Sequence, residues 1–242
     1  MGPQENLRQL LRHIVPAAAR ARLREWRGTG LYGKFANEHR AIFIHVPKTA
    51  GVSVRRALAM DHTFSSVHAT YLDYHLADPR KCRDFFKFAF VRNPFDRLLS
   101  AYAFLAAGGI PKWDSERKER VLHGIEGFEQ FVHERLTDVM HELHFRPQHE
   151  FLCDHSGALK MDFLGHVESM EQDFAAICAR LNITGQIAVH NTSIHGTSDA
   201  SYTHQMRAIV AGAYARDFSL FGYDPDGSAA VRRPESGSSP PG

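Results

Sequence analysis

The strongest constraint on the fold is a strand, loop and helix pattern in residues 41–58. Residues 41–46 form a short apolar run, rich in β-branched side chains, that stops at Pro47, as a buried strand does. Small residues follow, and apolar side chains then recur at helical spacing at Val54 and Leu58. The pattern predicts a tight loop at a helix N-terminus, where unpaired N–H donors and the helix dipole favour an anion.

The side chains of this loop suit an oxyanion group. Lys48 supplies a cation. Ala50 and Gly51 allow the backbone to approach a phosphate closely, and Thr49 and Ser53 offer hydroxyl groups. The pattern is not the Walker motif, because Lys48 comes three residues before the glycine instead of directly after it. Taken alone, the loop is equally compatible with an ordinary strand-to-helix connection that carries a surface lysine.

Residues 45–53, with the sequence His-Val-Pro-Lys-Thr-Ala-Gly-Val-Ser, resemble a loop known from one enzyme family. This is the 5′-phosphosulfate loop of sulfotransferases that use 3′-phosphoadenosine 5′-phosphosulfate (PAPS), in the branch of the heparan sulfate 2-O-sulfotransferases and related carbohydrate enzymes. The family usually has threonine where this chain has Val52, a minor departure because the expected contact is the backbone N–H. The resemblance implies donor contacts from Pro47, Lys48, Thr49, Ala50, Gly51, Val52 and Ser53.

The resemblance also implies the fold class. We expect an α/β, P-loop-NTPase-like fold of three layers, with a central, mostly parallel sheet flanked by helices. Residues 84–91 are the most strand-like run of the chain, and their near-continuous apolar character suits a central buried strand. Residues 162–168 predict a third buried strand, and residues 170–181 a helix with one apolar face.

A second motif begins at the end of the central strand. Arg92 follows the strand, a helix starts with Pro94 near its first position, and Ser100 lies two turns into that helix. The run resembles the family's 3′-phosphate motif, which implies that Arg92 and Ser100 hold the 3′-phosphate of the nucleotide. A guanidinium group suits this task because its fork binds phosphate oxygens bidentately. Asp96 and Arg97, in the same run, are compatible with an exposed ion pair.

Residues 63–72 predict a short strand that ends near His68 and a helix that starts about Thr70. The carboxyl end of a parallel strand is where open α/β proteins place their chemistry. The chain has 16 histidines, so a structural histidine is the simpler interpretation from the residues alone. The segment His-Ala-Thr-Tyr-Leu is similar, however, to the His-Val-Ser-Tyr-Leu segment that carries the proposed general base of the 2-O-sulfotransferases. The resemblance implies that His68 is the base.

Several further segments frame these motifs. Residues 106–120 contain paired glycines and a charged run, which suggests a mobile lid or an acceptor-side loop. Arg146 and Gln148 belong to a segment that resembles one lining the family's cleft, so we expect substrate or cofactor contacts from them, against a structural turn as the alternative. Residues 189–201 predict a loop that closes over a nucleotide, and residues 202–223 a closing helix.

The chain has 242 residues, enough for one full α/β domain and short for two. We expect a basic helical arm in residues 1–40, the sulfotransferase domain in 41–223 and a disordered tail in 224–242, which is rich in Pro, Gly and Ser. The arm suits peripheral contact with an anionic membrane or an acidic polymer, or is a solvated helix packed on the domain. A net charge of +2 gives no reason to expect nucleic acid.

Three widely spaced cysteines point to reduced thiols rather than to disulfides or a zinc site. No stretch of 18 apolar residues and no signal-peptide core are visible in the sequence. We therefore expect a soluble, cytoplasmic protein of bacterial type, although the resembling animal enzymes are Golgi membrane proteins. The sequence leaves the oligomeric state open.

The resemblance implies a PAPS-dependent carbohydrate sulfotransferase that releases 3′-phosphoadenosine 5′-phosphate (PAP) and needs no metal. Lys48 would stabilise the leaving group, and His68 would take the proton from a hydroxyl of the carbohydrate acceptor. Two alternatives stay open at this point. One is a small-molecule kinase of P-loop type, which would use ATP and Mg²⁺. The other is a non-catalytic protein that binds nucleotide or acidic glycan.

Overall fold

The computed structural model describes residues 19, 22, 30–60, 68–187 and 201–226. The chain divides into two compact units. Among the described residues, the first unit holds 19, 22, 30–46, 50–60, 68–90 and 150–187, and the second holds 47–49, 91–149 and 201–226. The strand expected before His68, the loop 189–200 and most of the N-terminal arm and C-terminal tail lie outside the described residues.

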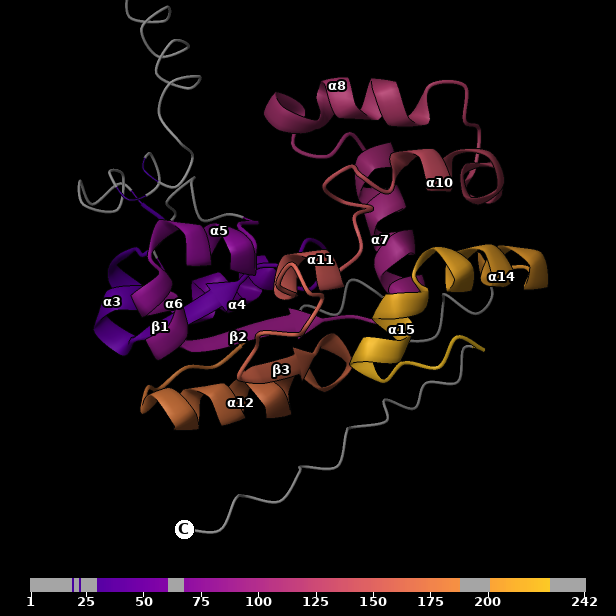
Figure 1. The fold of residues 1–242 in the computed structure, drawn as a ribbon. Coiled ribbons are helices and arrows are strands. Elements are labelled where there is room, and N and C mark those ends of the chain that lie inside the picture. The colour runs from indigo at the N-terminus through magenta and orange to yellow at the C-terminus, as the bar shows by residue number, and fades with distance from the viewer. Residues whose placement is uncertain (1–18, 20–21, 23–29, 61–67, 188–200, 227–242) are drawn as a thin grey trace, which may run out of the picture. The chain divides into compact units, whose positions relative to one another are not determined.

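A three-stranded sheet forms the centre of the first unit (Figure 1). Its strands are β1 (Ala41–Ile44), β2 (Phe86–Val91) and β3 (Phe163–His166), in the order β1-β2-β3. β1 and β2 are parallel, and Ala41 pairs with Phe86 at the start of the register. Every residue of β1 is buried, as expected for a strand covered on both faces. All three strands predicted in the described residues are confirmed.

Helices cover both faces of this sheet. They are α3 (Lys34–His39), α4 (Gly51–Ala57), α5 (Tyr71–Ala77), α6 (Pro79–Asp84) and α12 (Met170–Leu181), the last preceded by a 3₁₀ turn at Val167–Ser169. Figure 1 shows α12 along one side of the sheet and α5 along the other. Phe43 and Phe88 pack with Val54 of α4 and Phe174 of α12 in one apolar core. The arrangement confirms the expected α/β class with a parallel, helix-flanked sheet.

The second unit is helical. It contains α7 (Pro94–Ala106), α8 (Pro111–Leu122), α9 (Phe128–Gln130), a π-helical segment η2 (Phe131–Arg135), α10 (Leu136–Val139), α14 (His204–Ala213) and α15 (Ala215–Phe221). Short α11 (His149–Leu152) begins at the last residue of this part of the chain. Buried aromatic rings form its core, and the hydroxyl groups of Tyr202 and Tyr214 donate to backbone carbonyls at 2.9 and 2.6 Å.

The helix starts follow from local sequence chemistry. Asn93 caps α7 by accepting a hydrogen bond from the backbone N–H of Phe95 at 3.0 Å, and Pro94 occupies the first helical position. Thr70 and Asp73 form a capping box at α5. Both starts agree with the positions predicted from the sequence.

The charged run expected as a lid or loop forms helix α8 instead. Its Asp114 is 2% exposed and accepts a hydrogen bond from the backbone N–H of Ile110 at 3.0 Å. Arg117 and Arg120 of α8 bind the buried carboxylate of Glu142 at 3.2 and 2.6 Å. Charged side chains that suggested a loop, such as Arg117 and Arg120, are therefore bound by a carboxylate more than 20 residues away. A local sequence pattern does not reveal a partner at that distance.

Candidate active site

The loop after β1 has an unusual backbone. Lys48 and Ala50 have φ values of 69° and 59°, a left-handed conformation that non-glycine residues rarely adopt. Ala50 is the N-cap of α4. In the described part of the chain the N–H groups of Ala50, Gly51 and Val52 donate to no acceptor, whereas that of Ser53 donates to the carbonyl of Ala50 at 2.9 Å. Three of the expected donor amides are thus available to an anion, and the amide of Ser53 is already used.

Gly51 is required by the ring of His45. A Cβ atom added at Gly51 would lie 1.9 Å from Cδ2 of His45. His45 is 4% exposed, and burial, followed by the charges of His68 and Arg55, holds its pKa well below the usual value. A neutral imidazole therefore packs directly on the first residue of α4. Sequence reasoning noted the glycine for its approach to a ligand and missed the histidine that demands it.

His68 lies beside His45 in the same unit. Its Nδ1 is 3.0 Å from the backbone carbonyl of His45, and the two ring centroids are 4.4 Å apart. A carbonyl accepts, so Nδ1 carries the proton and the basic lone pair of the neutral ring is on Nε2. His68 also has a positive φ of 64°. The backbone and tautomer suit a general base that is held in one orientation.

Lys48 is a partly buried cation. Its Nζ lies 4.0 Å from the centroid of the Phe104 ring, a cation–π contact. Burial lowers the pKa of Lys48 to about 8, with a further lowering from the charge of Arg92 that the carboxylate of Asp114 partly offsets. Within the described residues no carboxylate forms a salt bridge with Lys48. A cation in this setting is well prepared to bind an anion.

Arg92 follows directly after β2, and Gln148 holds its backbone. The side-chain amide of Gln148 donates to the carbonyl of Arg92 at 2.8 Å and accepts from its N–H at 3.0 Å. These are the two bonds that a neighbouring strand would make. Gln148 is fully buried, and its own N–H donates to Asp217 of α15 at 2.7 Å. We expected Gln148 to contact substrate, but both of its side-chain polar atoms already have backbone partners.

Arg97 differs from the exposed ion pair that the sequence suggested. The residue is 2% exposed, and burial lowers its pKa. Its Nε donates to the carbonyl of Pro47 at 2.9 Å, and Nη2 donates to the carbonyl of Arg146 at 2.9 Å. Arg97 therefore ties the start of the loop to the segment around Arg146. Its position three residues after Pro94 and four before Ala101, both buried on α7, was the available signal.

For the remaining expected contact residues, Ser100, Arg146 and Thr49, the structure gives the exposure but no side-chain arrangement that points to a ligand. Ser100 is partly exposed on α7, and Arg146 is partly exposed with its carbonyl bound by Arg97. Thr49 is fully buried, so its hydroxyl does not face solvent. Among the described residues no group of three or more His, Cys, Asp or Glu is placed to hold a metal ion, and the expectation that the reaction needs none stays a prediction.

Strain in the described backbone gathers at these residues. Six non-glycine residues there have positive φ. Arg40 and Asn182 cap helix C-termini, and Ala59 follows the C-cap of α4, a common place for this conformation. The other three are Lys48, Ala50 and His68. Such strain persists where the surrounding structure enforces it, often at functional sites.

The residue types fit a phosphorylated and sulfated nucleotide. The second unit supplies Lys48 and Arg92 as cations, and the first supplies three open amides at the start of α4 together with His68. Amides and cations of this kind hold oxyanions, and an imidazole with a basic Nε2 accepts a proton. Each unit by itself therefore carries groups of the kind that bind an anion, and the first unit also carries an imidazole whose Nε2 is basic.

Comparison with known proteins agrees with this chemistry. The model of the family described as "Sulfotransferase family" matches residues 34–224. Carbohydrate sulfotransferase 14 of Danio rerio is 27% identical over 227 residues, which cover 77% of this chain and 60% of the relative. The chain thus spans about three fifths of the length of that curated relative. No solved structure matches the chain.

The similarity to the Danio rerio enzyme corrects our expectation about the location of the protein. It is an animal carbohydrate sulfotransferase, and the resembling animal enzymes are Golgi membrane proteins. The prediction of a cytoplasmic protein of bacterial type is therefore wrong. Within the described ranges, no helix has the length and apolar character needed to cross a membrane.

The match over residues 34–224 includes the loop after β1, the segment that carries His68 and the Arg92 motif. It confirms the resemblance that those motifs suggested. This chain belongs to the sulfotransferase family.

Proposed function

We propose that this protein transfers a sulfuryl group from PAPS to a hydroxyl group of a carbohydrate. Membership of the sulfotransferase family supports the reaction class, and the name of the zebrafish relative supports a carbohydrate acceptor. The segment 41–223 would carry the activity, with the arm 1–40, whose last residues form α3 on the sheet, before it and the tail 224–242 after it. The arm would contact either an anionic polymer or a membrane surface.

The donor would be held through its anionic groups. When bound, PAPS supplies the activated sulfuryl group, and PAP is the product. The open amides of Ala50, Gly51 and Val52 would bind the 5′-phosphosulfate, with Pro47, Thr49 and Ser53 shaping the loop around Lys48. Arg92 and Ser100 would bind the 3′-phosphate. Gln148 and Arg97 would act as positioning residues, the first for Arg92 and the second for Pro47.

The acceptor would be activated by His68. Its Nδ1–H donates to the carbonyl of His45, so Nε2 would take the proton of the attacking hydroxyl, a step worth about 10²–10⁴ in rate. Lys48 would stabilise the negative charge that develops on the leaving oxygen. Arg146 stays a predicted acceptor contact.

One observation carries the proposal most directly. Lys48 combines a left-handed backbone, partial burial and a pKa lowered to about 8 with the absence of a salt bridge among the described residues. The left-handed backbone and the burial of a charged group both destabilise the fold, so they are not expected of a lysine that serves only stability. They are expected of a lysine that stabilises a transient negative charge.

Calorimetric titration tests the donor. We expect PAP to bind without metal and at least tenfold more tightly than AMP, because AMP lacks the 3′-phosphate. Arg92→Ala should remove most of this preference, whereas Arg80→Ala, at an exposed arginine of α6, should leave it intact. Binding of ATP with Mg²⁺ in place of PAP would favour a kinase. PAP binding with no turnover on any glycan would favour a non-catalytic protein.

A further inference from the structure

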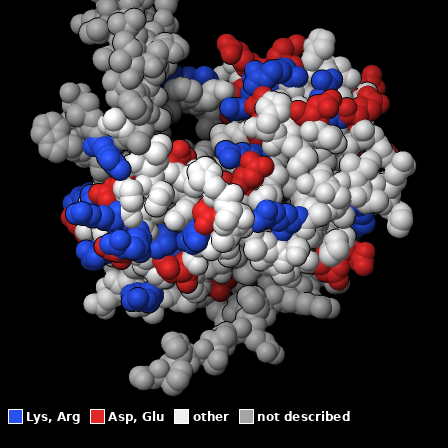
Figure 2. Space-filling view, viewed as in Figure 1, with Lys and Arg blue, Asp and Glu red and all other residues white. Residues whose placement is uncertain are grey.

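A charged pocket, separate from the candidate active site, lies in the first unit at the end of the sheet where the strands begin. It has a volume of about 590 Å³ and is lined by the C-terminal ends of α3, α6 and α12 and by the first residues of β2. Lys and Arg side chains gather over this end of the unit, at the left of Figure 2. The pocket is at the opposite end of β1 from Lys48 and shares no residue with the proposed donor site.

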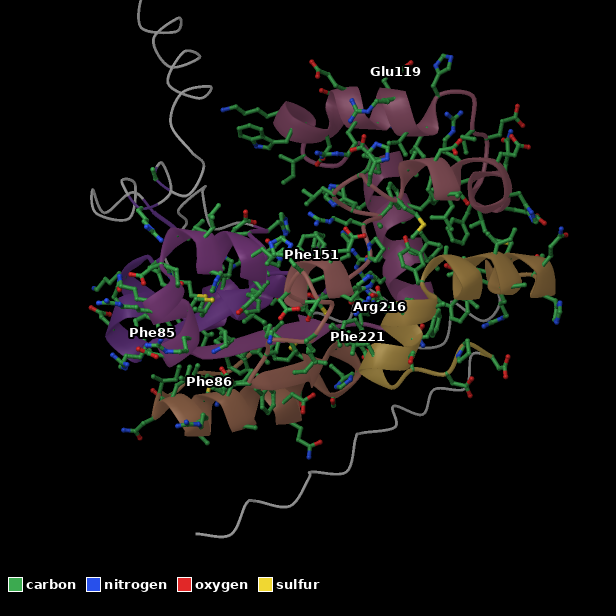
Figure 3. All side chains as sticks on the ribbon, viewed as in Figure 1. Phe85, Phe86, Glu119, Phe151, Arg216 and Phe221 are labelled. Carbon is green, nitrogen blue, oxygen red and sulfur yellow. The ribbon has the colours of Figure 1, made fainter. Side chains whose placement is uncertain are left out.

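Two arginines in this pocket are stacked on neighbouring aromatic rings. Cζ of Arg40 lies 5.1 Å from the centroid of Phe85, and Cζ of Arg180 lies 5.4 Å from that of Phe86. The two phenylalanines are consecutive, and Figure 3 shows them together at this end of the unit. Stacking limits the rotamers of a guanidinium group while leaving its N–H edge available for hydrogen bonds.

The two stacked arginines form no salt bridge with the described residues, although the hydrogen bond from Arg83 and, to a lesser extent, the charge of Arg40 lower the pKa of Asp84. Arg83 is bonded to Asp84 at 2.7 Å, and Lys87 to Asp162 at 2.8 Å. In contrast, neither Arg40 nor Arg180 forms a salt bridge or a side-chain hydrogen bond with any described residue. The pocket therefore combines two oriented guanidinium groups that have no salt bridge with two carboxylates that can accept hydrogen bonds.

We propose that this pocket binds the sulfate or carboxylate groups of an anionic oligosaccharide, as an accessory site for a polymeric substrate or product. The inference rests on the proposed function for the class of ligand. Guanidinium forks match planar or tetrahedral oxyanions bidentately, and Asp84 and Asp162 can accept hydrogen bonds from sugar hydroxyl groups. The volume lies in the range of small-ligand sites, about 300–1,000 Å³, which suits a short sugar segment better than a flat membrane surface.

Helix dipoles alone do not account for the arrangement. Cations are favoured at helix C-termini, and Arg40 and Arg180 lie at the ends of α3 and α12. A dipole explains why arginines are placed there, but not why both are stacked on consecutive rings at one pocket without a salt bridge. If the dipole were their only role, removing the charges would change stability and leave glycan binding unchanged.

The test is direct binding of a size-fractionated heparin octasaccharide to the full chain, measured by calorimetry without nucleotide. Arg40→Gln and Arg180→Gln should each weaken binding by about tenfold, and the double variant by about a hundredfold, because each removes one charge-assisted contact. Arg80→Gln is the matched control, an exposed arginine of the same unit outside the pocket. A desulfated, N-acetylated octasaccharide should bind weakly to the unsubstituted chain and to all four variants.

Three results would overturn the inference. One is octasaccharide binding by the double variant within twofold of the unsubstituted chain. Another is an equal loss in Arg80→Gln, which would indicate a general charge effect. The third is binding of the chain to vesicles containing phosphatidylserine, lost in the double variant while the octasaccharide fails to bind, which would assign the pocket to a membrane and reject the glycan. Because no donor is present, failure of the transfer reaction itself would not affect these measurements.

Discussion

At the scale of single residues, the site depends on side chains held at some cost to stability. Lys48 keeps a lowered pKa because it is buried and lies near Arg92. In the range between about pH 8 and its usual value near 10.4, the folded chain loses this proton before the unfolded chain does. The cost of holding the charged lysine is therefore full below pH 8 and decreases as the pH rises above it.

Replacement of this lysine should separate activity from stability. Lys48→Met should lower the transfer rate by about 10²–10³, the range for removing one electrostatic donor to the developing charge, while the Tm at pH 7 stays unchanged or rises. In the unsubstituted chain, kcat/KM should fall as the pH increases through about 8, the pKa of Lys48. Lys34→Met, at an exposed lysine of α3, should change none of these. A clear drop in the Tm of Lys48→Met would contradict the assignment.

Gly51 offers a second residue-scale prediction. Gly51→Ala should destabilise the chain by about 1–3 kcal/mol in urea unfolding, the usual cost of overpacking, because the new Cβ meets the ring of His45. The same substitution in a His45→Ala background should cost much less. Gly212→Ala is the control, since a Cβ there meets nothing within 4 Å on α14 and alanine favours a helix. Additive effects of Gly51→Ala and His45→Ala would contradict the close contact.

At the scale of elements, segments distant in sequence hold Arg92, which we propose binds the 3′-phosphate of the donor. Gln148 pairs with the backbone of Arg92 across 56 residues, and Asp217 of α15 binds the N–H groups of Gln148 and His149. These hydrogen bonds connect α15 to residues 148–149, and residue 148 in turn to the backbone at the end of β2. The bond from the N–H of Gln148 to Asp217 is buried and the others are partly buried, so each link is sensitive to loss of one partner.

Gln148→Met tests this positioning role. The substitution keeps the approximate side-chain volume but removes both bonds to Arg92, so it should cost about 1–3 kcal/mol of stability and weaken PAP binding about tenfold. Binding of AMP, which lacks the 3′-phosphate, should change little. Gln172→Met, at an exposed glutamine of α12, serves as the control. Equal losses for PAP and AMP would show that the substitution disturbs more than Arg92.

Helix α8 depends on the buried carboxylate of Asp114. Burial raises the pKa of Asp114, but hydrogen bonds from Ile110 and His144 and the charge of Arg117 more than offset this and hold it below its usual value. Its contribution to stability is therefore present above the unfolded pKa, near 3.9, and is lost as the pH falls through the folded value. Neutral and mildly acidic solutions should leave α8 intact.

Removal of this carboxylate should release α8. Asp114→Ala should cost about 3–5 kcal/mol, as for a broken buried ion pair, and hydrogen exchange should accelerate along Pro111–Leu122 before it does in α12. Asp138→Ala, at an exposed aspartate of α10, should leave exchange unchanged. Protection of α8 in Asp114→Ala equal to that of the unsubstituted chain would contradict this role.

At the scale of the whole molecule, the expected contacts are distributed over both units. The first unit holds residues 50–53 and His68, and the second holds 47–49, Arg92, Ser100, Arg146 and Gln148. The loop after β1 thus belongs partly to each. A ligand that binds the folded chain through these residues must stabilise it by mass action.

We therefore expect PAP to raise the melting temperature. At one hundred times its Kd, PAP should add about 2.7 kcal/mol of stability, or roughly 5–10 °C in Tm for a chain of this size. Arg92→Ala should reduce the shift to the level that AMP produces. ATP with Mg²⁺ should give a smaller shift than PAP at equal concentration. The reverse order would contradict the sulfotransferase reading of the site.

Much of the fold is readable from short-range patterns. The apolar runs at β1, β2 and β3, the proline start of α7 and the cap of α5 depend on residues within a few positions of one another. Their conformational preferences therefore act locally and survive in the folded chain. The family motifs at Lys48, His68 and Arg92 lie at such junctions, so the sequence was also enough to identify the family.

Contacts between distant residues were decided only by the tertiary structure. Burial of Arg97, pairing of Gln148 with the backbone of Arg92 and the helical state of the charged segment 111–122 each depend on partners 22 to 56 residues away. The same is true of the pocket lined by Arg40 and Arg180, which three separate helices form. A local pattern states what a side chain can do, but its burial, its pKa and its partner are set by what the rest of the chain packs around it.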